Sequence, residues 1–113
     1  MKPFKTTALV LSGLMLATGP ANAACNTGSC GPTLVKELYV NTGGQVYVEL
    51  SDSLSPLDCT PVPGGYLTLD MSLPTSDEVY ALLLSTHLQQ SPIWVRLNNQ
   101  SAGCTIAYVQ SEK

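Results

Sequence analysis

His87 is the only histidine of the 113-residue chain, so any Ser–His or Cys–His nucleophilic scheme has to use it. It falls within the apolar stripe of a predicted helix, where a lone histidine usually has a structural role. The paired carboxylates Asp77 and Glu78 suit the first turn of that helix, and Asp52 and Asp58 suit turns. Phosphate loops, dinucleotide fingerprints and metal-spaced histidine pairs are missing. We therefore expect a protein that is not an enzyme and that needs no cofactor and no metal.

Aromatic side chains on predicted strands favour a binding function instead. Each is expected on an outward strand face, where a ring stacks on a sugar or fills a protein interface. The alternative is packing beneath the helix or against the N-terminal arm. Polar loops at residues 51–53 and 98–101 suit glycan hydroxyl groups, although such composition is common in loops. The candidate binding residues are Trp94, Tyr39, Tyr47 and Tyr66.

Four cysteines indicate an oxidised, exported protein. An even number of cysteines in an exported chain predicts two disulfides, for which three pairings exist. A zinc site is the alternative, but only the first two cysteines have close spacing. We expect Cys25–Cys30 as a local link and Cys59–Cys104 as a long one.

The first 23 residues have the organisation of a signal peptide. Lys2 and Lys5 precede an uncharged apolar run at residues 7–18, and residues 21–23 supply small residues for cleavage. Residues 24–113 are then expected to form one secreted or periplasmic domain. No later segment is long and apolar enough to span a membrane. Lipidation at Cys25 is the competing interpretation, but Asn22 stands where a lipobox requires Leu.

Loss of the leader leaves an acidic domain. Residues 24–113 contain three basic and eight acidic side chains, which gives a net charge of −5. Such a surface repels phosphate backbones, so we expect no nucleic-acid partner.

Five segments show the alternation of strands, and one has the period of a helix. In the first strand, Leu34, Leu38 and Val40 are expected to face inward and Val35 outward. Glycines at residues 43–44 predict a hairpin turn, and the loop at residues 51–65 is expected to be pinned by Cys59. The predicted strands are residues 33–41, 45–50, 66–71, 93–97 and 105–109, and residues 24–32 are expected to form an arm.

The helix lies between the third and fourth predicted strands. Thr75 and Glu78 have the spacing of a capping box. Val79, Tyr80, Leu83 and Leu84 form one apolar stripe. Leu82 and Leu88 lie outside this stripe, which makes them candidate interface residues.

This order predicts a mainly β fold, a five-stranded OB-fold-like barrel with one α-helix between strands 3 and 4. An open α+β sheet of the same elements is the alternative. We favour the barrel, because an open sheet leaves two long edges exposed.

The segment DEVYALLLSTHLQQSPIWVRL, followed by GCTIAYV, resembles the C-terminal half of small secreted proteins related to the B subunits of AB5 toxins, including the subtilase cytotoxin and pertussis-like subunits. The resemblance covers residues 79–109. It implies an OB fold, a pentameric ring and glycan binding, but none of the family's sugar-contacting residues matches a position here.

Two functions follow from these observations. The first is a secreted, non-enzymatic binding module that takes a glycan and forms homo-oligomers or joins an exported partner subunit. The second is a small exported, disulfide-stabilised structural or interaction protein. An enzyme centred on His87 is the third and least supported interpretation.

Overall fold

The computed structural model describes residues 24–112, so the signal peptide expected at residues 1–23 lies outside the described residues. The described chain forms six strands and one helix. In order they are β1 Ser29–Thr33, β2 Val35–Val40, β3 Val46–Leu50, β4 Leu67–Leu69, α1 Ser76–Gln89, β5 Ile93–Leu97 and β6 Ile106–Ser111.

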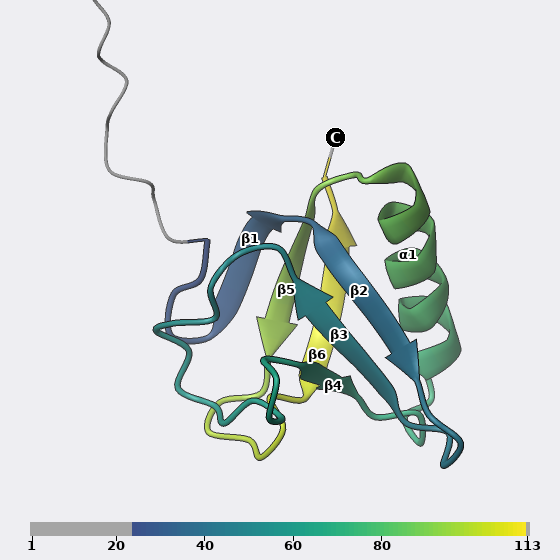
Figure 1. The fold of residues 1–113 in the computed structure, drawn as a ribbon, viewed down its shortest axis with the longest axis horizontal. Helices are drawn as coiled ribbons and strands as arrows, with labels where there is room; N and C mark the ends of the chain where they lie inside the picture. Colours follow the sequence, from purple (N-terminus) through teal and green to yellow (C-terminus); the bar gives the residue numbers. More distant parts are fainter. Residues whose placement is uncertain (1–23, 113) are drawn as a thin grey trace, which may run out of the picture.

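The strands form two antiparallel three-stranded sheets, β1-β5-β6 and β2-β3-β4 (Figure 1). Alternate positions of β3, β4 and β5 are buried, as the period-2 pattern predicts. The fold is therefore mainly β with one helix. Its largest fully buried side chains are Leu67, Leu69, Leu83, Ile93, Leu97 and Ile106.

The prediction of a five-stranded barrel is wrong for residues 24–112, which have six strands and no closed barrel. Residues 24–32 were expected to be an arm, but Ser29–Thr33 pairs with β5 as strand β1. The strand pattern is interrupted at Leu34, and the next strand pairs with β3 in the other sheet. In residues 24–112, the only backbone bridge between the two sheets is a parallel one, between Thr68 and Thr105.

A β-bulge in β2 reverses the predicted facing of Val35, whereas Leu38 and Val40 keep the expected face and pair with the buried Val48 and Val46. The register shifts between Val35 and Glu37, so the alternation restarts after the bulge. Val35 is consequently fully buried, although it was expected to face outward. Val40, which was expected inward, is 52% exposed at the end of the strand.

Helix α1 packs against β2 and β6 (Figure 1). Two hydroxyl side chains are buried on it, and both donate to backbone carbonyls: Ser76 Oγ to Met71 O at 3.1 Å and Thr86 Oγ1 to Leu82 O at 2.8 Å. The predicted capping box is wrong, because Thr75 makes no side-chain cap bond. Its ψ of 12° departs from the extended conformation in which a capping hydroxyl reaches the helix amides. The helix ends at Gln89, and Gln90 follows it as a left-handed cap with φ at 52°.

Both predicted disulfides are present, Cys25–Cys30 and Cys59–Cys104. The long loop before β4 is pinned at Cys59 and by backbone bonds on either side, Asp58 N–H to Thr27 O and Thr60 N–H to Ser101 O, both 3.0 Å. Such disulfides are compatible with an extracellular or periplasmic location. In residues 24–112, α1 falls short of the length and apolar character that a bilayer-crossing helix needs.

Candidate functional site

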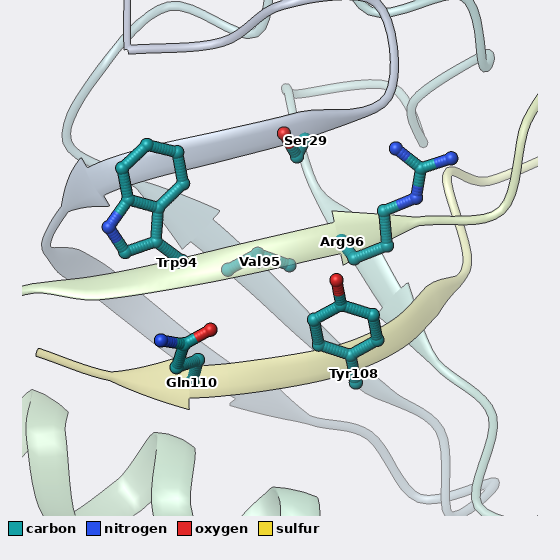
Figure 2. A pocket seen from close by; sticks show the side chains of 6 residues that line it. All are labelled: Ser29, Trp94, Val95, Arg96, Tyr108 and Gln110. Atoms are coloured by element: carbon teal, nitrogen blue, oxygen red, sulfur yellow. The ribbon is translucent and has the colours of Figure 1, made fainter.

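The outer face of the β1-β5-β6 sheet carries a hollow of about 200 Å³ (Figure 2). Strand register brings its side chains together, because Trp94 pairs with Gln110 and Arg96 pairs with Tyr108. Ser29 on β1 pairs with Arg96 from the other side. Residues paired across antiparallel strands point to the same face of the sheet, so three strands contribute to one surface.

The Trp94 indole is held in place at one end of this hollow (Figure 2). A Cβ atom at Gly31 would overlap the indole, so only glycine lets the ring lie this close to β1. The indole N–H donates to the Glu112 carboxylate. The Glu112 amide in turn donates to the Pro92 carbonyl at 3.0 Å, which ties the residue beyond β6 to the start of β5. The ring is thus positioned from two sides while remaining partly exposed.

Arg96 supplies the positive charge of the hollow. Its guanidinium lies over Gly28, where a Cβ atom would collide with it, and donates to Asn99 Oδ1 at 3.4 Å. Within residues 24–112 it makes no ion pair. A guanidinium has five N–H donors, so most of them remain free for a ligand.

This arrangement suits a small polar ligand with one apolar face. An indole and a phenol provide flat apolar surface, and the Arg96, Gln110 and Ser29 side chains provide hydrogen-bonding groups beside it. Pockets for drug-sized ligands measure roughly 300–1,000 Å³, so this hollow suits a smaller chemical group.

The structure separates the aromatic residues that the sequence grouped together. Trp94 lies in the hollow, whereas Tyr39, Tyr47 and Tyr66 come together on the β2-β3-β4 sheet, with ring centroids 5.8–6.3 Å apart. They form a second surface.

Five lining residues of the hollow were not predicted as binding residues, among them Val95, which the alternation placed inward. The spacing of two residues between Trp94 and Arg96 on a predicted strand already indicated that both side chains lie on the same outward face. Tyr108 and Gln110 carried the same signal two residues apart on the last strand. Ser29 gave no signal, because the strand that holds it was assigned to an arm.

The two candidate interface leucines differ in exposure. Leu88 is 75% exposed, whereas Leu82 is half-buried. Leu84, which was predicted to face the core, is also exposed. The exposed apolar surface of α1 therefore lies at Leu84 and Leu88, one helical turn apart.

His87 connects α1 to the sheet. Its Nδ1–H donates to the Val35 carbonyl oxygen at 2.9 Å. The side-chain amide of Gln90 donates to the same oxygen at 3.4 Å. All four described cysteines are in disulfides, which leaves His87 without a thiol partner in residues 24–112. In the same residues, no group of three His, Cys, Asp or Glu side chains is placed to hold a metal ion.

No family model, curated protein or solved structure matches this chain. Function therefore has to be inferred from the geometry of residues 24–112.

Proposed function

We propose that this protein is a secreted or periplasmic, non-enzymatic binding module whose ligand is a glycan. The observation that carries this proposal is the placement of Trp94, Arg96 and Tyr108 around one hollow. The C–H face of a sugar ring stacks on an aromatic side chain, while its hydroxyl groups bond to guanidinium, amide and hydroxyl groups at the edge. His87 serves as a structural contact in this proposal, and no residue is assigned to catalysis.

We also propose that the two sheets are arranged as a partly open OB-fold barrel. The interrupted segment β1–β2 would act as one bent strand shared by both sheets, and the Thr68–Thr105 bridge would join β4 to β6. The helix between β4 and β5 would then occupy the position expected for this fold. OB folds bind oligosaccharides on their strand faces and loops, which supports a glycan as ligand. The resemblance of residues 79–109 to toxin B subunits supports the same ligand class.

A glycan array tests this proposal with two variants. The protein is expected to bind a subset of glycans, and Trp94→Ala is expected to lose this binding. Tyr39→Ala serves as the control, because it removes an exposed ring from the other sheet and leaves the hollow unchanged. Loss of binding in both variants, binding that survives Trp94→Ala, or an array without signal would contradict the proposal.

The exposed leucines of α1 favour a second function, that of an interaction protein, and we propose a second copy of this chain as the partner. Leu84 and Leu88 present adjacent apolar side chains that a partner helix covers. The resemblance to ring-forming subunits supports self-association. Light scattering at micromolar concentration is expected to show an oligomer, and a monomer would refute this function.

A further inference from the structure

Three tyrosines cover the outer side of the β2-β3-β4 sheet. Tyr39 and Tyr47 are direct cross-strand partners with ring centroids 5.8 Å apart. Tyr66 lies 6.1 Å and 6.3 Å from these two rings. We call this surface, with Glu37 and Glu49, the tyrosine face.

The Tyr66 ring is held by the backbone beneath it. The Tyr66 N–H and C=O both bond to Val62, at 3.2 Å and 3.0 Å, which closes the turn before β4. The Tyr66 ring lies against Gly64, where an added Cβ atom would come within 2.9 Å of it. Tyr39 remains 47% exposed. The tyrosine face is thus an aromatic surface open to solvent, in which the Tyr66 ring is held in place from beneath.

Two carboxylates border the rings. Glu37 and Glu49 face each other across β2 and β3, a like-charge pair that is unfavourable unless a cation lies nearby. Lys36 Nζ lies 3.5 Å from Glu49. Glu37 only accepts a hydrogen bond from the Tyr66 hydroxyl, at 3.1 Å, and forms no ion pair within residues 24–112. One negative charge next to three rings is therefore not neutralised by the described chain.

The negative charge of these carboxylates changes the acidity of the Tyr66 hydroxyl. The hydrogen bond to Glu37 raises the pKa of Tyr66, and the charges of Glu37 and Glu49 raise it further. The same field attracts a cation to the ring faces, because the face of an aromatic ring is itself electronegative.

We propose that the tyrosine face binds an arginine side chain of a partner protein, stacked on the rings and paired with Glu37. A guanidinium is planar and weakly hydrated, so it stacks on a ring and bonds to a carboxylate at the same time. A lysine ammonium, which is a strongly hydrated point charge, uses such a flat surface less well. This site lies on a different sheet from the Trp94 hollow and does not depend on the glycan proposal.

NMR titration of the ¹⁵N-labelled protein with a short arginine-containing peptide tests this proposal. The matched probe is the same peptide with citrulline in place of arginine, which keeps the planar shape and removes the charge. Amide signals of Glu37, Tyr39 and Tyr47 are expected to shift with the arginine peptide and not with the citrulline peptide. The Trp94 indole signal reports the other sheet and is expected to stay in place.

Two pairs of variants separate the tyrosine face from general charge. Glu37→Gln and Tyr39→Leu are each expected to weaken arginine-peptide binding about two- to five-fold, the range for one exposed cation–π or surface ion pair. Glu78→Gln is the charge control on α1, and Tyr108→Leu is the ring control on the other sheet. Both are expected to bind the arginine peptide as the unchanged protein does.

Equal shifts from the citrulline peptide, an absence of shifts, or shifts centred on Trp94 would overturn the proposal. Equal weakening by Glu78→Gln would also overturn it, since it would reduce the effect to net charge. Binding of the arginine peptide that weakens with added salt and with the two tyrosine-face variants supports it.

Discussion

Removal of the Cys59–Cys104 disulfide is expected to cost far more stability than removal of Cys25–Cys30. The two links close loops of very different length, with sequence separations of 45 and 5. Replacing both cysteines of one pair with alanine removes one link and leaves the other in place. Each double variant is therefore the control for the other.

The expected magnitude follows from loop closure in the unfolded chain. A 45-residue separation corresponds to about 4 kcal/mol of lost stability, and a 5-residue separation to about 2 kcal/mol. Both pairs combine one fully buried cysteine, Cys104 or Cys30, with one almost buried, Cys59 or Cys25. The packing cost of Cys→Ala is thus similar in the two variants. The remaining difference, about 2 kcal/mol, isolates the loop-length effect.

Urea unfolding followed by circular dichroism measures this difference. The Cys59→Ala/Cys104→Ala variant is expected to have the lower free energy of unfolding in urea. In thermal unfolding, its Tm is expected to lie about 8–16 °C below that of the other variant. Equal free energies for the two variants would refute the reasoning. So would a larger loss from the short link, because loop length would then not govern the effect.

Two further predictions concern the helix and a turn. Leu83→Ala is expected to lower the free energy of unfolding by about 2–5 kcal/mol, because Leu83 is fully buried. Ser85→Ala, at an exposed position of the same helix, is expected to change it by less than about 0.5 kcal/mol, and similar losses for the two variants in urea unfolding would contradict this. The Ser72 hydroxyl and amide donate to Asp70 at 2.7 Å and 3.0 Å and lower the pKa of its carboxyl group. The unfolded chain therefore binds this proton more readily, so the contribution of Asp70 to stability is present above about pH 4 and is lost as the pH falls through the native pKa. Asp70→Asn is expected to show a shallower loss of stability in acid than the unchanged protein, and parallel curves of unfolding free energy against pH would count against it.

The period-2 alternation of the sequence correctly predicted the strands that bury one face and leave the other partly exposed. In β3 and β5, buried aliphatic residues alternate strictly with partly exposed aromatic or charged ones, and both strands formed within one residue of the expected bounds. The sequence of β1, SCGPT, contains a glycine and a proline, which are both depleted in strands. Its pairing with β5 depends on residues at least sixty positions away, so no local pattern could reveal it.

Similar limits applied to the two surfaces. The shared outward face of Trp94 and Arg96 follows from their spacing, but their neighbours on β1 and β6 depend on register. Tyr39 and Tyr47 lie on one hairpin, whose turn places them opposite each other. Tyr66 joins them only because β4 pairs with β3 after a long loop. The β2 bulge reversed the facing of Val35, which a strict period of two cannot predict.

The bond between Glu112 and Trp94 has a practical consequence for binding assays. A purification tag or surface linker attached after Glu112 would start next to the indole that borders the hollow. Protein immobilised in this way would present the hollow toward the support, and a glycan array read with it would report weak binding for a steric reason. A linker before Ala24 would also start close to the indole, because the Ala24 carbonyl accepts from the Gly31 N–H at 2.8 Å and Gly31 packs against the ring. Neither end of the described chain is therefore a neutral attachment site for such an assay.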